Sequence, residues 1–131
     1  MKKLFIILAL FAAALSVSAQ NKVLVYYFHA TQRCPTCLAI ESNTKKVLEE
    51  NFKSELSKGT VVFKVINKDD EKNKALVDKY QVVFSSLYLI KVRNGKETKN
   101  DLTSDAFRYA RNDPEKFKQV LTEAIKKKLN E

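Results

Sequence analysis

The pattern of hydrophobic and polar positions predicts four β-strands in this chain. Residues 21–29 are rich in β-branched and aromatic side chains, and both sets of alternating positions are apolar, which is typical of a central strand buried on both faces. Residues 60–67 and 87–93 are two further strand-forming segments. Asn94 and Gly95 are the strongest short signal for a hairpin turn, which leads into a polar edge strand at residues 96–100.

Three helices are predicted between and after these strands. From residue 35 to about residue 56 the apolar residues fall on one helical stripe, and Gly59 follows as a stop signal. A short helix is expected up to about residue 80, capped by the acidic pair at positions 69 and 70. The last helix opens with Asp113 as a cap and Pro114 at the first helical position, and it carries one apolar face to about residue 129.

The expected order is strand, helix, strand, helix, strand, strand, helix. The long crossover between the first two strands implies that they are parallel and joined in a right-handed unit. The polar segment 101–112 has few apolar anchors, and we expect a loop with one helical turn there.

The first twenty residues have a different composition. They run from Lys2 and Lys3 through an uncharged apolar segment, residues 4–15, to small residues that end at Ala19. This is the pattern of a secretory signal peptide that is cut after Ala19. The apolar segment has about 12 residues and a bilayer requires roughly 20, so no stable membrane span is expected after cleavage. The sequence thus predicts a signal peptide at 1–19 and a single domain at 20–131.

The charge of the chain gives little indication of a partner. Its 24 Lys and Arg against 15 Asp and Glu give a formal net charge of +9, which falls to +7 once Lys2 and Lys3 are removed. The one lysine run, at 126–128, suits the C-terminal end of a helix. No nucleic-acid partner is expected, because aromatic residues do not interleave with the basic ones. Attraction to an anionic membrane surface or an acidic partner stays open, as does the oligomeric state.

Both cysteines lie in one short segment, FHATQRCPTCLAIE at residues 28–41. Export would place them in a periplasmic or extracellular compartment, where disulfides form and persist. Cys34 opens the predicted helix, where unpaired backbone N–H groups and the helix dipole favour its thiolate, and Arg33 is adjacent in sequence. Cys37 lies one turn further and faces the core, where burial favours the thiol. These positions assign Cys34 as the nucleophile and Cys37 as the resolving cysteine.

Three neighbouring residues are candidates for supporting roles. Pro35 fits the first helical turn, where no N–H is missed, and it stiffens the ring that the cysteines close. His29, at the end of the first strand, could shuttle protons or stabilise the Cys34 thiolate, although a lone histidine there is more often half-buried and hydrogen-bonded. Glu41 follows Cys37 by four residues and could accept its proton, or could lie on exposed helix surface.

Two other interpretations of the cysteine pair stay open. A structural disulfide is a poor use of this spacing, because a four-residue loop gains about 2 kcal/mol on the chain-entropy model, against about 3 kcal/mol for fifteen residues. A metal site would join Cys34 and Cys37 to His29, with Glu41 as a fourth ligand. A closed zinc site usually has four sulfur or nitrogen ligands, and the chain supplies at most three. A site shared between two chains, or a copper site, is a further alternative.

The order of elements, with Cys-x-x-Cys opening the first helix, resembles the thioredoxin fold over about residues 23–129. Its Cys-Pro-Thr-Cys is similar to the glutaredoxin pattern more than to the Cys-Gly-Pro-Cys of thioredoxin. The resemblance implies an α/β fold with a central mixed four-stranded sheet flanked by helices on both faces. It also implies dithiol–disulfide exchange with protein or small-molecule thiols, without an organic cofactor.

The chain departs from that family in two places. Thioredoxin-like oxidoreductases have a cis-proline just before the third strand, and Ser86 stands there in this chain, with Ser85 the alternative if the register slips by one. A cis bond before serine would cost about 3 to 4 kcal/mol, so we predict a trans peptide. The first strand also lacks the buried aspartate of thioredoxin. These departures leave the dithiol chemistry available, bear on how a substrate docks and slightly favour the metal alternative.

The sequence therefore predicts an enzyme, a periplasmic or secreted thiol–disulfide oxidoreductase. The Cys34 thiolate would attack a substrate disulfide, and Cys37 would resolve the mixed disulfide. The rival from another class is a binding module of the same fold, which would use Cys34 and Cys37, with His29, for a metal or a permanent disulfide. Neither the direction of electron flow nor the physiological partner follows from the sequence.

Overall fold

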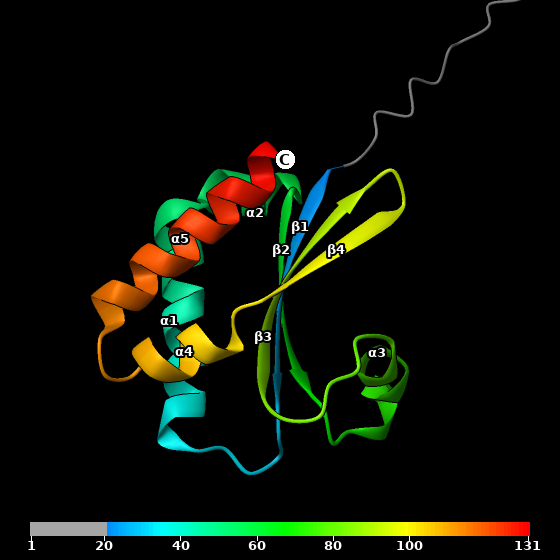
Figure 1. The fold of residues 1–131 in the computed structure, drawn as a ribbon, viewed down its shortest axis with the longest axis vertical. Coiled ribbons are helices and arrows are strands. Elements are labelled where there is room, and N and C mark those ends of the chain that lie inside the picture. Colours follow the sequence, from blue (N-terminus) through cyan, green and yellow to red (C-terminus); the bar gives the residue numbers. More distant parts are fainter. Residues whose placement is uncertain (1–20) are drawn as a thin grey trace, which may run out of the picture.

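The computed structural model describes residues 21–131 and has one four-stranded sheet (Figure 1). The strands are β1 (Lys22–His29), β2 (Val61–Asn67), β3 (Ser86–Arg93) and β4 (Lys96–Asp101), in the spatial order β2-β1-β3-β4. β1 pairs with β2 in parallel, while β3 is antiparallel to both β1 and β4. This mixed sheet confirms the expected α/β class and is consistent with a thioredoxin-like arrangement. The signal peptide expected at 1–19 lies outside the described residues.

Five α-helices and one 3-10 helix accompany the sheet in the described part of the chain. They are α1 (Pro35–Asn51), α2 (Lys53–Lys58), the 3-10 helix η1 (Glu71–Asn73), α3 (Lys74–Lys79), α4 (Thr103–Tyr109) and α5 (Pro114–Asn130). α1, α4 and α5 cover one face of the sheet, and the short α3 lies on the other (Figure 1). The expected cover on both faces is therefore uneven. Within residues 21–131, no helix is long and apolar enough to cross a membrane.

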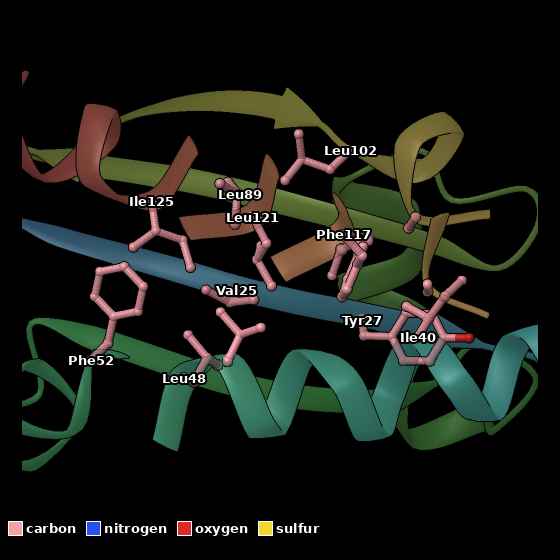
Figure 2. Close-up of a cluster of buried hydrophobic side chains, with 14 of the residues drawn as sticks. Val25, Tyr27, Ile40, Leu48, Phe52, Leu89, Leu102, Phe117, Leu121 and Ile125 are labelled. Carbon is pink, nitrogen blue, oxygen red and sulfur yellow. The ribbon is translucent and has the colours of Figure 1, made fainter. Parts of the chain in front are cut away.

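The larger hydrophobic core lies between the sheet and the helices α1 and α5. Val23, Val25 and Tyr27, the odd-numbered apolar residues of β1, belong to it and are fully buried. Figure 2 shows Val25 between Leu48 of α1 and Leu121 of α5. The alternation along β1 thus directs one set of side chains into this core.

The even-numbered residues of β1 form a second, aromatic core on the opposite face. Tyr26 and Phe28 pack there with Tyr80 and Ile66, and the partly buried Leu76 of α3 covers them. The rings of Tyr26 and Tyr80 meet edge to face, with centroids 6.0 Å apart. The prediction that β1 is buried on both faces is confirmed.

The hairpin between β3 and β4 has the predicted turn. Asn94 and Gly95 have φ angles of 53° and 74°, and Arg93 pairs with Lys96. Positive φ at both central positions is the requirement of a type I′ turn, which asparagine and glycine meet at low cost.

The prediction of one continuous helix over residues 35 to about 56 is wrong, because the helix is broken. α1 ends at Asn51, and Phe52 leaves the helical conformation with φ −132° and ψ 28° before α2 begins. The ring of Phe52 is 2% exposed and packs in the larger core (Figure 2). Burial of this ring accounts for a break that the continuous apolar stripe did not indicate. The stop at Gly59, with φ 74°, is as predicted.

The segment 101–112 holds a helix of about two turns, where one turn was expected. Leu102, Ala106 and Ala110 lie four residues apart and are all buried, so they form one packed stripe. Two of the three are alanines, which carry little weight in a search for apolar periodicity. The larger apolar residues of the segment, Phe107 and Tyr109, are more exposed.

The two acidic residues after β2, Asp69 and Asp70, have different roles. Asp70 caps η1 by accepting from the backbone N–H of Lys72 at 3.2 Å. Asp69 instead accepts from the backbone N–H of Thr31 at 2.9 Å. The expected single helix is therefore η1 followed by α3, and Asp69 ties the loop after β1 to the loop after β2.

Candidate functional site

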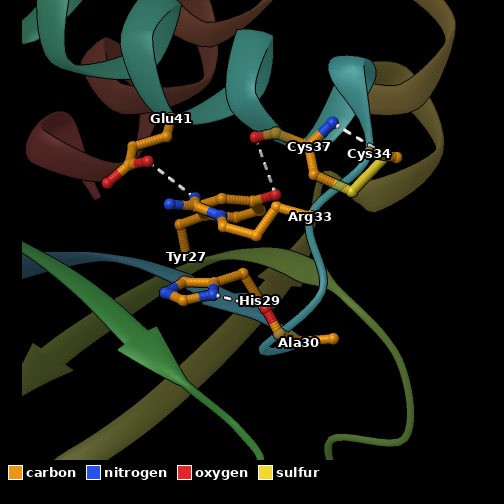
Figure 3. The surroundings of a disulfide bond; sticks show 7 residues. All are labelled: Tyr27, His29, Ala30, Arg33, Cys34, Cys37 and Glu41. Atoms are coloured by element: carbon orange, nitrogen blue, oxygen red, sulfur yellow. Dashed lines mark hydrogen bonds and ion pairs between the residues drawn. A yellow bond between two sulfur atoms is a disulfide. The ribbon is translucent and has the colours of Figure 1, made fainter.

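The two cysteines form a disulfide at the N-terminus of α1 (Figure 3). Cys34 is the residue that caps the helix and Cys37 lies in its first turn, so their Cα atoms are 5.0 Å apart. That separation lies within the usual range for a disulfide. β1 carries the chain to this end of the sheet, and residues 30–33 connect it to the helix.

Cys34 caps α1 through its sulfur. Its backbone is extended, with φ −80° and ψ 161°, and its Sγ accepts from the backbone N–H of Cys37 at 3.0 Å. Pro35 occupies the first helical position, as predicted. A sulfur held here faces free helix N–H groups and the positive end of the dipole, which stabilise a thiolate more than a thiol.

The two sulfur-bearing residues differ in exposure. Cys34 is exposed, whereas Cys37 is 7% exposed. This difference agrees with the expected division into an attacking and a resolving cysteine, because only an exposed sulfur can meet a second protein.

Tyr27 is hydrogen-bonded to the backbone of Cys37, the predicted resolving cysteine. Its hydroxyl donates to the carbonyl oxygen of Cys37 at 3.0 Å, a buried hydrogen bond that joins β1 to the first turn of α1 (Figure 3). Burial raises the pKa of the Tyr27 phenol above its ordinary value, and the nearby Arg33 guanidinium opposes this rise. The phenol therefore remains a donor throughout the pH range in which thiols react.

Arg33 and Glu41 are brought to each other. Their side chains form an ion pair of 2.6 Å and are both partly buried. Arg33 thus has a carboxylate partner, which the sequence did not indicate. Glu41 lies partly buried against Arg33, where exposed helix surface was the alternative. The role of Glu41 in proton transfer stays a prediction, as does the effect of Arg33 on the Cys34 thiolate.

His29 lies apart from the disulfide. It is half-buried, and its Nδ1 is 2.8 Å from the carbonyl oxygen of Ala30, so Nδ1–H donates. Figure 3 shows its ring across Tyr27 from the two cysteines. No group of three His, Cys, Asp or Glu side chains within residues 21–131 is close enough to hold a metal ion. The four residues of the metal alternative are therefore not gathered into one ligand set.

Ser86 begins β3 opposite Phe28, on the strand next to β1. Its peptide bond is trans, as predicted, since residues 21–131 contain no cis peptide. Ser86 is 2% exposed, and its hydroxyl donates to the carbonyl oxygen of Phe84 at 2.7 Å. Ser85, the alternative, is the one of the two serines that reaches the surface groove described next.

A groove of about 510 Å³ adjoins the disulfide, and Cys37 forms part of its wall. The other lining residues come from the segment before β3 and from α4, and none is charged: Phe84, Ser85, Thr103, Ser104 and Phe107. Phe84 is 64% exposed, which is unusual for so large an apolar side chain.

α4 is fixed beside the sheet by a buried hydrogen bond. The hydroxyl of Thr103 accepts from the backbone N–H of Leu87 at 3.1 Å. This groove was not predicted from the sequence, because residues 101–112 were expected to form a loop with one helical turn. The apolar run Val82, Val83 and Phe84, placed just before a strand that is itself buried, was the available signal.

Comparison with known proteins adds little. No family model and no curated protein matches this chain. A solved structure described as "Structure of a malarial protein" is similar at 20% identity, with a TM-score of 0.44, over 68% of this chain and 92% of that one.

Proposed function

We propose that the protein is a thiol–disulfide oxidoreductase that works outside the cytoplasm through Cys34 and Cys37. The observation that carries the proposal is the position of the Cys34 sulfur. It is exposed and caps α1, while the sulfur bonded to it belongs to a buried residue. A helix N-terminus lowers the pKa of a thiol, and a low pKa combined with exposure is what distinguishes reactive cysteines from structural ones.

The reaction begins from the oxidised pair when a partner thiolate attacks the exposed Sγ of Cys34. The new bond joins the partner to Cys34, the Cys34–Cys37 bond breaks, and Cys37 leaves as a thiolate that takes up a proton. A second thiolate of the partner then attacks the partner's own sulfur and releases Cys34 as a thiolate. The partner has lost two electrons, and the Cys34–Cys37 pair has gained them. The same steps in reverse reduce a partner disulfide.

The helix N-terminus assists the last step of this sequence. Cys34 is released as a thiolate at the position where the Cys37 N–H already donates to its sulfur. The donor and the dipole are in place before the charge develops, so little rearrangement is needed. Tyr27 holds the carbonyl of Cys37 during the same step.

The reduction potential of the pair tests the proposal. The purified protein would be equilibrated in thiol–disulfide buffers of known composition, and the reduced and oxidised forms would be counted by alkylation and mass spectrometry. We expect a potential between about −270 and −120 mV, the range of exchange enzymes, with equilibrium reached quickly. A potential below about −300 mV with slow exchange indicates a permanent structural disulfide and contradicts the proposal.

A matched pair of variants tests the order of attack. Cys37→Ser should accumulate mixed disulfides on Cys34, because the residue that resolves them is absent. Cys34→Ser removes the exposed sulfur and should accumulate almost none. Equal trapping by the two variants would contradict the assigned roles.

A further inference from the structure

The groove beside the disulfide has an aromatic and hydroxyl lining without a charged side chain. Its two rings, Phe84 and Phe107, come from separate elements and are 64% and 36% exposed. Covering such rings with an apolar side chain is favourable, because it removes apolar surface from water on both partners.

We propose that this groove selects the substrate of the exchange reaction. The selected substrate is a protein segment with an uncharged aromatic or aliphatic side chain beside its reacting cysteine, and glutathione is a poor substrate. This inference rests on the proposed exchange function. Phe84 and Phe107 are then the residues that determine specificity.

The position of the groove brings it within reach of a bound substrate. Cys37 lines it, and the Cα atom of Cys37 is 5.0 Å from that of Cys34, to which the substrate bonds. Neighbouring Cα atoms in a substrate are about 3.8 Å apart. A side chain next to the substrate cysteine can therefore enter the groove while the mixed disulfide exists.

The size of the groove does not separate the two kinds of substrate. A volume of about 510 Å³ falls in the range of sites that hold drug-sized ligands. It would admit a bulky side chain with part of its backbone, and equally a tripeptide such as glutathione. The preference between a protein segment and glutathione therefore depends on the charge of the lining residues.

Charge complementarity favours the apolar protein segment. Glutathione carries two carboxylates, and a carboxylate is costly to bury where no cation or donor set replaces its water. The nearby Arg33 is already paired with Glu41 at 2.6 Å. α4 carries one acidic and one basic residue, Asp105 and Arg108, and neither lines the groove. The residues that line the groove therefore offer no positive charge to a carboxylate.

Three disulfide probes test the proposal on the reduced, purified protein. Two are symmetrical disulfides of short peptides with blocked ends and no charge, one with phenylalanine and one with glycine beside the cysteine. The third is oxidised glutathione. The second-order rate of oxidation of the protein would be measured for each. We expect the phenylalanine peptide to react at least about tenfold faster than the glycine peptide, as burial of one aromatic ring allows, and glutathione to be the slowest.

Phe84→Ser and Val83→Ser form a matched pair of variants. Both replace a highly exposed apolar residue, so neither should disturb folding, but Val83 does not line the groove. Phe84→Ser should bring the two peptide rates within about threefold of each other, mainly by slowing the phenylalanine peptide. Val83→Ser should retain the preference of the natural protein.

A gain-of-function variant tests the argument from charge. Ser104 is exposed and lines the groove. Ser104→Lys should increase the glutathione rate several-fold, and added salt should reduce that gain. Ser104→Gln is the uncharged control.

The outcomes separate this inference from the function on which it rests. Equal rates for the two peptides, a preference that survives Phe84→Ser, or glutathione as the fastest probe would each overturn the inference and leave the exchange function standing. Failure of all three probes to oxidise the protein would overturn both.

Discussion

The N-termini of α1 and α5 are built alike and differ in the group that caps them. Each helix has 17 residues, begins with a proline after the cap, and has a cap side chain that accepts from the backbone N–H of the third helical residue. In α5 the acceptor is the carboxylate of Asp113, at 3.1 Å from the nitrogen of Lys116. In α1 it is the sulfur of Cys34, at 3.0 Å from the nitrogen of Cys37.

The difference lies in when the negative charge is present. α5 has Asp113 at its cap, Glu115 in its first turn, and lysines in its last turn, so fixed charges compensate its dipole at both ends. α1 has no acidic residue in its first turn. Its cap becomes negative only when the disulfide is reduced and Cys34 ionises. One helix uses its N-terminus to stabilise the fold, and the other leaves it available for a charge that appears during the reaction.

Replacing the two caps in turn should have the largest and most unequal effect. Cys34→Ser should lose all measurable exchange, because a hydroxyl cannot form the mixed disulfide. Asp113→Ser keeps a capping hydroxyl and should retain the natural exchange rate. Both variants can be assayed with the same peptide disulfides. Residual exchange in Cys34→Ser would mean that Cys37 can attack directly and that the two sulfurs are not divided as proposed.

Tyr27→Phe should lower the free energy of unfolding, because it removes a hydrogen bond that joins β1 to α1. This is one buried hydrogen bond, from the Tyr27 hydroxyl to the carbonyl oxygen of Cys37, and such a bond contributes about 0.5 to 1.5 kcal/mol net. Urea unfolding of the oxidised protein measures the loss. A change of less than a few tenths of a kcal/mol would show that the hydrogen bond contributes nothing net.

The pH dependence of stability provides a second measurement on Tyr27. Burial raises its pKa above the ordinary 10.0, so its contribution is fully present below pH 10 and is lost as the pH rises through the raised value. Tyr26 and Tyr80 are shifted in the same direction, in both cases mainly by burial. The comparison of Tyr27→Phe with the natural protein isolates one residue, and the stability difference between them should shrink as the pH rises past 10.

Asp113→Ala should cost about 1 kcal/mol of stability, the usual price of losing an N-cap. The effect should be the same in the oxidised and reduced forms and should not change the exchange rate. Cys34→Ala, compared with the natural protein in its reduced form, should cost less at a pH where the thiol is protonated, because a thiol is a weak acceptor. Equal losses of stability in Asp113→Ala and Cys34→Ala would mean that a thiol stabilises a helix N-terminus as well as a carboxylate does. The proposed difference between the caps of α1 and α5 would then be wrong.

Thr36→Glu transfers the fixed charge of α5 to α1 and has the smallest expected effect. Thr36 follows its cap by two residues, as Glu115 follows Asp113. A charge at this position is worth about 0.3 to 1 kcal/mol and should oppose the thiolate, so the pKa of Cys34 should rise by up to about 0.7. Thr36→Gln is the uncharged control, and an equal rise in both variants would exclude charge as the cause.

Most of the sheet could be predicted from the sequence because its signals are local. The two apolar faces of β1, the Asn94-Gly95 turn and the Asp113-Pro114 start of α5 depend on neighbouring residues alone. The break at Phe52 and the length of α4 could not be predicted, because each depends on which side chain the larger core accepts. The stripe of α1 continues through the break, and the alanines of α4 give little periodicity.

The features of the candidate site also differ in whether the sequence alone could predict them. The cap of Cys34 and the burial of Cys37 follow from four consecutive residues, and the sequence was sufficient for both. The ion pair of Arg33 with Glu41 required the path of the loop after β1. The groove required Phe84 and Phe107, which are far apart in the sequence and meet only when α4 packs beside the start of β3.

The most direct test of the account is the pKa of Cys34 in the reduced protein. In the Cys37→Ser variant only one thiol titrates, and the backbone N–H at position 37 remains to donate to it. The rate of alkylation by iodoacetamide as a function of pH would give the value. Stabilisation of the thiolate by the helix N-terminus should hold the pKa of Cys34 clearly below the ordinary value of about 8.5. A pKa at or above about 8.5 would mean that the helix N-terminus does not stabilise the thiolate, which contradicts the central claim.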